Sequence, residues 1–281
     1  MRPAWNEEIY SRTPFKAAQK KCLRESNVCL LALGSLGSSI ALGMARAGVG
    51  NFILCDPAKL KIENVSRHEG DTQDVGEFKA VIVKQKIARI NPGIRVVCKN
   101  EDIFTNNDKV IRQVFEDTSL TVASTDKTSA QLICNYWTYT LKIPALFAGC
   151  YEEARAGEVF FTIPGSGSAC YGCLRDGLVQ PYDNKKIDYS TARNAEDYVG
   201  EPGLHAAVTM ISSIATQIAM GILLRDENSG LGKLINPREN WAMIGTGLSK
   251  DFYKFKKPFE VFFQRLKGPR RNCYTCKGGG V

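Results

Sequence analysis

Several side chains that could bind a nucleoside triphosphate follow one another in the first half of the sequence. Asp56 directly follows an apolar run, and an acid at the end of a strand can bind ribose hydroxyls. Asn64, Arg67 and Lys79 come next, and two cations with an amide suit a triphosphate better than a pyrophosphate between two nucleosides. Asp126 follows a later apolar run, where a carboxylate that faces phosphates is a typical Mg²⁺ ligand.

A glycine-containing turn precedes these residues. The segment CLLALGSLGSSIALGMARAGVG (29–50) passes from an apolar run through Gly34 and Gly37 into small residues at helical spacing. Backbone N–H groups at such a turn can approach phosphate, and the N-terminus of the following helix favours negative charge. The G-x-G-x-x-G fingerprint is incomplete, because Ala32 occupies its first position. On its own the turn is weak support for a ligand site.

Each charged residue also has a purely structural alternative. Arg67 and Lys79 could form surface ion pairs, and Asp126 could cap the helix expected after it. Their joint order behind a glycine turn favours nucleotide binding over these alternatives.

Two C-x-x-C pairs indicate a metal site. Four thiolates in two such pairs are the usual ligands of a structural, tetrahedral Zn²⁺; a disulfide or an iron–sulfur cluster is the less favoured alternative. The pairs are Cys170 with Cys173 and Cys273 with Cys276. The chain has ten cysteines, and its first residues lack the apolar core of a signal peptide. We therefore expect a reducing, cytoplasmic location.

The elements that must position these residues are short apolar runs alternating with helical patterns. Strands are expected at 28–33, 52–55, 94–98, 119–124 and 145–149, and helices after Gly37, at about 78–90 and at 128–142. This alternation predicts an α/β fold with a Rossmann-like, doubly wound, mostly parallel sheet. After Gly157, the stretches EVFFTI, NWAMIG and FEVFFQRL predict C-terminal antiparallel strands, with an exposed loop at 174–203 between them.

The composition argues against a membrane protein and against a nucleic-acid-binding protein. The uncharged stretch 203–224 is long enough to cross a membrane, but its polar residues and its place inside an α/β pattern favour a buried helix. The net charge of +8 arises from scattered basic residues, so a nucleic-acid-binding surface is not favoured.

Taken together, the motifs resemble the ThiF/MoeB/HesA superfamily, whose larger members are the ubiquitin-activating enzymes. The resemblance extends from about Tyr10 to Cys276. The stretches that carry it are ARAGVGNFILCD, ENVSRH, DVGEFKA, INPGIRV and TDKTSAQ. The matching residues of the ATP-site pattern are Gly34, Leu36, Gly37, Ser38, Asp56, Asn64, Arg67, Lys79 and Asp126.

The resemblance implies an ATP-dependent adenylyltransferase. The implied ligand roles are ribose for Asp56, phosphates for Asn64, Arg67 and Lys79, and Mg²⁺ for Asp126. The C-terminal carboxylate of a small β-grasp, ubiquitin-like or sulfur-carrier protein, or of a peptide, would attack the α-phosphate. The products would be an acyl-adenylate and pyrophosphate, and no general base is needed because a carboxylate is already ionised near neutral pH.

The same resemblance implies the organisation of the chain. We expect an N-terminal helical segment (1–27), an ATP-binding part (28–157), and a carrier-binding part with the zinc site (158–281). Arg12 resembles an arginine that enters the ATP site of a neighbouring subunit, which implies a homodimer. Ala58, where the family often has a second aspartate, departs from the pattern, as Ala32 does.

Many relatives transfer the activated carboxylate to a cysteine in the loop that corresponds to 178–204, but this stretch contains none. We expect the chain to stop at the adenylate or to pass it to another protein, with Cys150 as a poor alternative. Arg155 and Arg193 are loose candidates for contacts with the tail of the partner. His68 is expected to shape the loop after Arg67 and not to act as a base.

Three other functions remain open at this stage. The chain could be a catalytically idle partner of a heterodimeric activating enzyme, which the departures at Ala32 and Ala58 and the missing cysteine favour. It could adenylate a carboxylate on tRNA, which the positive charge allows. A nicotinamide dehydrogenase is less favoured, because no acid or base for a hydride site is evident.

Overall fold

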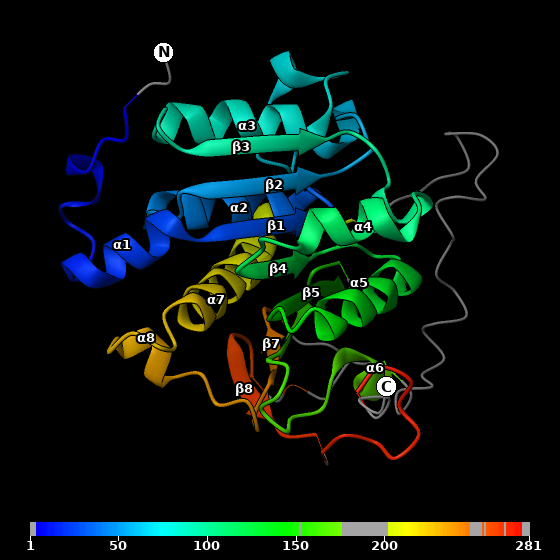
Figure 1. The fold of residues 1–281 in the computed structure, drawn as a ribbon. Coiled ribbons are helices and arrows are strands. Elements are labelled where there is room, and N and C mark those ends of the chain that lie inside the picture. Colours follow the sequence, from blue (N-terminus) through cyan, green and yellow to red (C-terminus); the bar gives the residue numbers. More distant parts are fainter. Residues whose placement is uncertain are drawn as a thin grey trace.

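The described residues include a sheet of eight strands that runs through the molecule (Figure 1). The computed structural model describes residues 4–151, 153–175, 202–247, 255, 257–266 and 268–276. The strands are β1 (Asn27–Leu31), β2 (Asn51–Cys55), β3 (Arg95–Lys99), β4 (Leu120–Ala123), β5 (Ala145–Tyr151), β6 (Ala156–Thr162), β7 (Trp241–Gly245) and β8 (Glu260–Gln264). Their order is β3-β2-β1-β4-β5-β6-β7-β8.

The first five strands are parallel, and β6, β7 and β8 are each antiparallel to the strand before them. The expected α/β fold with a mostly parallel sheet and C-terminal antiparallel strands is therefore confirmed. Gly157, the last residue of the expected ATP-binding part, lies within β6 and pairs with Cys150 and Ile244.

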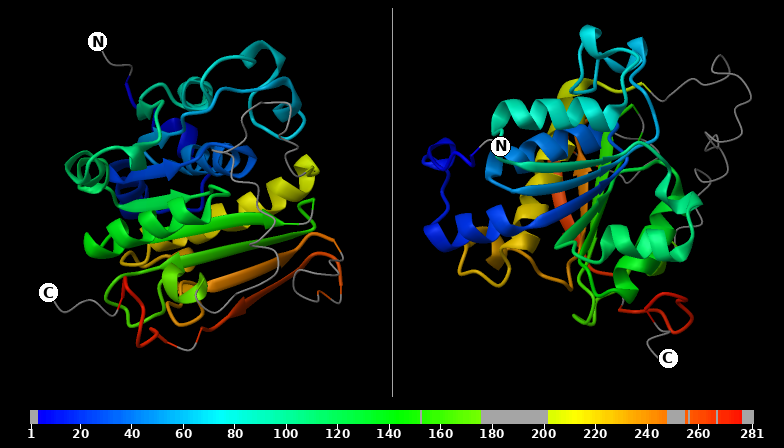
Figure 2. Two further views of the ribbon diagram at one scale, coloured as in Figure 1. Left: turned by 90° about the vertical axis from the view of Figure 1, so that its right-hand side faces the viewer. Right: turned by 45° about the horizontal axis from the view of Figure 1, so that its top comes forward.

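Helices cover both faces of this sheet (Figure 2). The helices are α1 (Ala17–Glu25), α2 (Ser35–Ala47), α3 (Lys79–Ile90), α4 (Asp108–Phe115), α5 (Thr128–Thr140), α6 (Tyr171–Arg175), α7 (His205–Leu223) and α8 (Gly230–Lys233). Buried residues of α2, α3 and α7 form one hydrophobic cluster with the sheet, and buried residues of α4, α5 and α6 belong to a second.

Strand β1 shows why the parallel strands are apolar throughout. Val28 and Leu30 belong to the cluster of α2, α3 and α7, whereas Cys29 and Leu31 belong to the cluster on the opposite face. Both faces of the strand are thus removed from water, which favours a continuous apolar run over alternation. Cys29 and Cys55 are small buried residues of this core.

Helix α7 is the buried helix expected at 203–224. By length and composition it is the described helix that could cross a membrane, but 56% of its apolar window is buried inside the protein. Ile211, Ala215 and Ala219 on it are fully buried in the core cluster.

The structure differs from expectation in two segments. The first two residues of the exposed loop expected at 174–203 belong to α6 instead, and Leu174 is buried. Residues 176–201, including Arg193, lie outside the described residues, and 202–204 form no helix or strand.

Helix α4 is the second difference, since no helix is expected there from the sequence. Its signals are nevertheless present in the chain. The side chain of Asn107 caps the helix by accepting a hydrogen bond from the N–H of Val110. The residues buried at helical spacing are Ile111, Val114 and Phe115.

The turn between β1 and α2 is strained at the position where the glycine fingerprint is incomplete. Ala32 has a φ of 65°, in the left-handed region that favours glycine. Its carbonyl oxygen accepts a hydrogen bond from Ser124 Oγ at 2.8 Å. A Cβ at Gly37 would collide with the same carbonyl oxygen and would lie 2.5 Å from Ser124 Oγ. The turn therefore requires glycine at position 37 but tolerates alanine at position 32.

We expect Ala32→Gly to stabilise the protein. A left-handed alanine costs about 1–2 kcal/mol, and glycine returns about 0.4–1 kcal/mol through the greater freedom of the unfolded chain, so the net gain is about 0.5 kcal/mol. Denaturant unfolding measures it. Ala41→Gly, inside α2, is the control and should destabilise by at least about 0.5–1 kcal/mol. Equal losses in both variants would contradict the strain at Ala32.

Candidate functional site

The candidate site lies where the strand order reverses between β1 and β4. Strands β1, β2 and β3 extend to one side of this point, and β4 and β5 extend to the other. The loops that leave the carboxyl ends of β1 and β4 therefore diverge, and this crevice is where doubly wound sheets bind ligands.

Leu33 is held from both sides at this crevice. Its N–H donates a hydrogen bond to Asp56 Oδ2 at 2.6 Å, and its carbonyl oxygen lies 2.8 Å from His68 Nε2. The two contacts join the turn after β1 to the loop after β2. They fix the backbone immediately before Gly34.

Asp56 is almost fully buried and its carboxylate is held by the backbone. Besides Leu33, it accepts a hydrogen bond from the N–H of Ala58 at 2.7 Å. An ionised carboxylate has about four acceptor positions, so two printed bonds leave capacity for hydroxyl donors. Ala58 contributes its backbone here, although its side chain departs from the family pattern.

The N-terminus of α2 is open. Gly34 is the N-cap residue, and no described side chain caps this helix. A Cβ placed on Gly34 would meet nothing within 4 Å. The first N–H groups of a helix lack partners within the helix, and its dipole favours an anion there. This end of α2 therefore has the features of a phosphate-binding turn.

Lys79 begins α3 close to this turn. Its backbone N–H donates to the carbonyl oxygen of Ala58 at 3.0 Å, two residues beyond Asp56. After burial, which is the main cause, the charge of Lys79 also lowers the pKa of His68, whereas the charge of Asp56 raises it. Among the described residues Lys79 forms no ion pair, so the surface ion-pair alternative is not seen for this side chain.

Asn64 and Arg67 lie in the loop between β2 and α3. The carbonyl oxygen of Asn64 accepts hydrogen bonds from the N–H groups of Arg67 at 3.0 Å and His68 at 2.9 Å. The carboxamide oxygen of Asn64 accepts from the N–H of Lys61 at 3.1 Å. The carbonyl oxygen of Arg67 lies 3.2 Å from His205 Nδ1, which connects this loop to the start of α7.

Asp126 is exposed in the turn between β4 and α5. The N-cap residue of α5 is Lys127, so Asp126 precedes the cap and does not occupy that position. Ser124, two residues earlier, bonds the carbonyl oxygen of Ala32. This hydroxyl is a contact that the sequence analysis does not identify, and it joins the turn of Asp126 to the glycine turn.

His68 is buried and structural. Its Nδ1 accepts a hydrogen bond from the N–H of Gly70 at 2.8 Å, so Nε2 carries the proton and donates to the carbonyl oxygen of Leu33. Burial is the main cause that lowers its pKa from the ordinary value of 6.5. The expectation that His68 shapes the loop after Arg67 is confirmed.

Arg12 lies at the end of the sheet where the parallel strands begin, opposite to the end that carries Gly34. Tyr10, two residues before Arg12, is buried, and its hydroxyl donates to the carbonyl oxygen of Ala45, near the C-terminal end of α2. Helix α2 has 13 residues, which is about 20 Å. Figure 1 shows this N-terminal segment where the strands begin, away from the arrowheads. Arg12 is therefore remote from Gly34 of its own chain.

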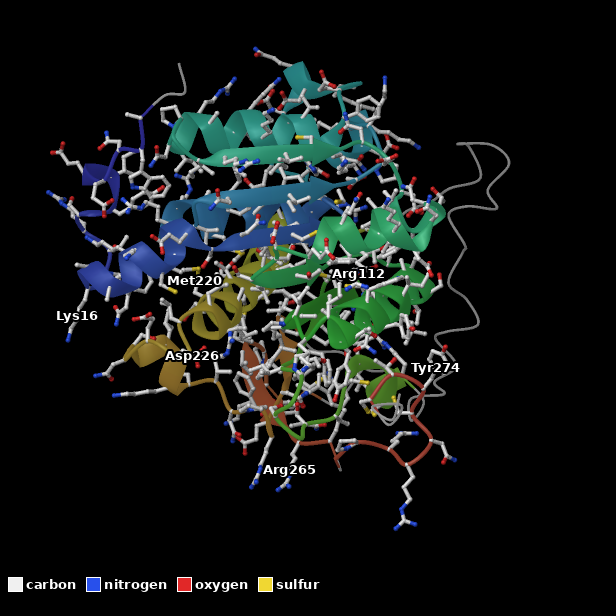
Figure 3. All side chains as sticks on the ribbon, viewed as in Figure 1. Lys16, Arg112, Met220, Asp226, Arg265 and Tyr274 are labelled. Carbon is white, nitrogen blue, oxygen red and sulfur yellow. The ribbon has the colours of Figure 1, made fainter. Side chains whose placement is uncertain are left out.

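The four paired cysteines form one cluster. Their sulfur atoms all lie within 4.8 Å of one another, and neighbouring Sγ atoms are separated by 3.3 to 3.9 Å. Tetrahedral Zn–S bonds of about 2.3 Å place sulfurs about 3.8 Å apart, so the cluster fits such an ion. A hydrogen bond from the Cys170 thiol is the main cause that lowers the pKa of Cys173, to about 5. Tyr274, labelled in Figure 3, follows Cys273 in the chain, and its exposed ring stacks on that of Tyr136 with centroids 5.7 Å apart.

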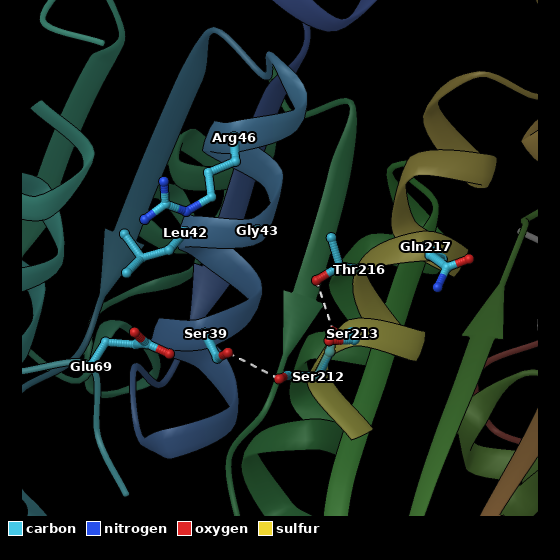
Figure 4. Close-up of a pocket in the computed structure, with 9 residues that line it drawn as sticks. All are labelled: Ser39, Leu42, Gly43, Arg46, Glu69, Ser212, Ser213, Thr216 and Gln217. Carbon is cyan, nitrogen blue, oxygen red and sulfur yellow. Dashed lines mark hydrogen bonds between the residues drawn. The ribbon is translucent and has the colours of Figure 1, made fainter. Parts of the chain in front are cut away.

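A separate cavity of about 330 Å³ lies between α2 and α7 (Figure 4). Hydroxyl groups line much of it, and Ser212 donates a hydrogen bond to Ser39 at 3.0 Å. Arg46 and Glu69 lie on the α2 side. None of the sequence-predicted site residues lines this cavity.

The sequence profile of the ThiF family matches residues 9–254. The match covers most of the chain, and the protein therefore belongs to the ThiF family.

Curated relatives are adenylyltransferases and activating enzymes. The ThiS adenylyltransferase of Bacillus subtilis (strain 168) is 28% identical over 175 residues, which are 61% of this chain and 50% of that protein. The molybdopterin-synthase adenylyltransferase of Salmonella typhimurium is 29% identical over 173 residues, covering 60% and 66%. Ubiquitin-like modifier-activating enzyme 5 of Drosophila virilis is 26% identical, covering 54% and 40%. This chain thus spans between 40% and 66% of these relatives.

Solved structures share the fold. Escherichia coli MccB with AMPCPP and MccA has a TM-score of 0.71 at 19% identity, covering 96% of this chain and 75% of that chain. PaaA has a TM-score of 0.68 at 14% identity, covering 88% and 75%. At these identities the likeness establishes the architecture.

His68 should make stability depend on pH. Because burial lowers its pKa, the folded protein binds this proton less readily than the unfolded chain does. Stability is therefore fully present above about pH 6.5 and is lost as the pH falls through the pKa of the folded state. We expect melting temperatures measured between about pH 7.5 and 5.5 to fall more for the wild type than for His68→Gln.

His205, the other histidine of the chain, is exposed and supplies the control. His205→Gln should follow the wild-type curve. A His68→Gln curve parallel to that of the wild type would show that His68 does not titrate in this range.

Proposed function

We propose that this protein is an ATP-dependent adenylyltransferase. Its substrate would be the C-terminal carboxylate of a small ubiquitin-like or sulfur-carrier protein, or of a peptide, and its products an acyl-adenylate and pyrophosphate. The observation that carries the proposal is that Asp56 and the turn of Asp126 are both hydrogen-bonded to the backbone just before the uncapped N-terminus of α2. The names of the relatives, which include adenylyltransferases of sulfur carriers, support it.

Electrostatic repulsion is the main barrier in this reaction, because a carboxylate must approach a polyanion. Two unit charges about 4 Å apart repel by about 4 kcal/mol at an effective dielectric constant of about 20. Lys79 and Arg67 would stabilise the charge that accumulates on the phosphates, and the N–H groups of α2 would fix their position. Asp56 would orient the ribose. Mg²⁺ held by Asp126 would neutralise part of the phosphate charge.

The proposed homodimer rests on Arg12. Arg12 lies where the parallel strands begin, so it cannot reach the ATP site of its own chain, where these strands end. A role in the site of a second subunit is therefore favoured. Within one chain, residues 28–157 would bind ATP, and 158–281 would bind the carrier, with a cytoplasmic location as the free cysteines suggest. The 178–204 stretch contains no cysteine, so the adenylate would be the final product on this chain.

A catalytically idle subunit of a heterodimer is the second candidate. The observation that favours it is Ala32, which departs from the glycine of the family pattern and lies in the left-handed region at this turn. Pyrophosphate exchange distinguishes the two candidates.

We expect the wild type to exchange labelled pyrophosphate into ATP when a carrier protein or peptide ending in glycine is present. Lys79→Ala should lower the exchange rate by about 10²-fold or more, because it removes a charge from the transition state. Lys84→Ala, an exposed lysine on the same helix, is the control and should retain the rate. Absence of exchange with sulfur carriers, ubiquitin-like proteins and peptides alike would favour the idle subunit.

We propose that the cysteine cluster holds one structural Zn²⁺. Because a closed tetrahedral site has no open position, the metal would stabilise the fold and take no part in the reaction. We expect about one equivalent of zinc in the purified protein by elemental analysis, and Cys276→Ser should lose it and lower the melting temperature. Cys22→Ser, another partly buried cysteine, should keep the zinc. Full zinc content in Cys276→Ser would refute the site.

A further inference from the structure

A buried polar chain connects β6 to the turn that carries Asp126. Glu158 on β6 is 3% exposed, and its carboxylate accepts hydrogen bonds from Arg175 Nη2 at 2.6 Å and Trp241 Nε1 at 3.0 Å. The hydroxyl of Tyr151 also donates to it. A buried carboxylate is tolerable only when it is paired and hydrogen-bonded, and here both oxygens of Glu158 accept from donors.

The chain continues from Arg175 to α5 in one direction. Arg175 Nε donates to the hydroxyl of Tyr171 at 2.6 Å, and Tyr171 donates in turn to Gln131 Oε1. Gln131 Nε2 then donates to the carbonyl oxygen of Thr125 at 2.7 Å. Because a guanidinium can only donate, the direction of every bond after it is fixed, including the orientation of the Gln131 amide.

Helix α5 forms hydrogen bonds with Tyr171 through two residues that lie one helical turn apart. Gln131 binds its hydroxyl, and Asn135 Oδ1 accepts from its backbone N–H at 3.1 Å. The Asn135 amide also donates to Cys170 Sγ at 3.5 Å, beside the cysteine cluster. The Tyr171 ring stacks on Phe147, with centroids 4.2 Å apart. All these groups are buried, so Tyr171 is a fixed point in the core.

The turn of Asp126 is held at the two residues that precede Asp126. Before it, Ser124 Oγ bonds the carbonyl oxygen of Ala32 in the glycine turn. At its centre, the carbonyl oxygen of Thr125 accepts the bond from Gln131. Asp126 is exposed, and the backbone on which it stands is held by these two contacts.

We propose that Tyr171 and Gln131 are positioning residues that orient the turn of Asp126 for the metal-bound nucleotide. The inference rests on the proposed function only insofar as Asp126 holds the Mg²⁺ of MgATP. Neither side chain touches the nucleotide; both act through the Thr125 carbonyl. Loss of the Tyr171 hydroxyl would free Gln131 and loosen the turn, and the contribution of Mg²⁺ to ATP binding would fall.

Tyr171→Phe tests the proposal, because phenylalanine keeps the ring stack and removes only the hydroxyl. The affinity for ATP is measured by calorimetric titration with Mg²⁺ and with a chelator. We expect the affinity with Mg²⁺ to fall about 5-fold, the equivalent of one hydrogen bond, and the affinity without Mg²⁺ to change less than about 2-fold. Tyr139→Phe, on α5 beside the cysteine cluster, should change neither value.

Gln131→Glu is the second variant, because a carboxylate cannot donate to Thr125 but keeps the shape of the side chain. Gln131→Glu should also lower the affinity for ATP with Mg²⁺ more than the affinity without Mg²⁺. It keeps the test valid if Tyr171→Phe does not fold. Equal losses with and without Mg²⁺, or no loss in either variant, would overturn the proposal. Mg²⁺-dependent ATP binding without any pyrophosphate exchange would reject the proposed adenylation and leave the positioning role intact.

Discussion

The site depends on the backbone of Leu33, which Asp56 and His68 hold from opposite sides. Both faces of β1 are buried, so the strand cannot shift along the sheet without exposing apolar side chains. The hydrogen bonds at Leu33 extend this rigidity beyond the strand into the glycine turn. The N-terminus of α2 is consequently held in one orientation with respect to the loops after β2 and β4.

The chemistry that we propose uses this rigidity because anionic reactants must be held close together. Charged side chains on flexible loops would have to be ordered during the reaction, whereas fixed N–H groups and cations stabilise charge without reorganisation. The left-handed Ala32 is a local strain that the surrounding contacts maintain, since Ser124 and the packing of Gly37 leave its carbonyl little freedom.

Much of the fold could be predicted from the sequence. The parallel strands are continuous apolar runs because both of their faces are buried, and the helices between them repeat apolar residues at helical spacing. Helix α4 was missed although its capping asparagine and its apolar residues at helical spacing are present, because eight residues are too short a stretch for this periodicity to stand out. The last residues of α6 fall within an expected loop, because this helix is held through contacts of Tyr171 with Asn135 and Gln131, which are distant in the sequence.

The sequence by itself determined the fold class, the two cysteine pairs and the residue types of the nucleotide site, since periodicity and motif spacing are local properties of the chain. Only the tertiary structure decided that Arg12 lies at the opposite edge of the sheet from Gly34. It also decided that Glu158, Arg175, Tyr171 and Gln131 form one hydrogen-bonded chain. A buried charge is stable only where its partners are, and those partners come from separate strands and helices that meet when the sheet is assembled.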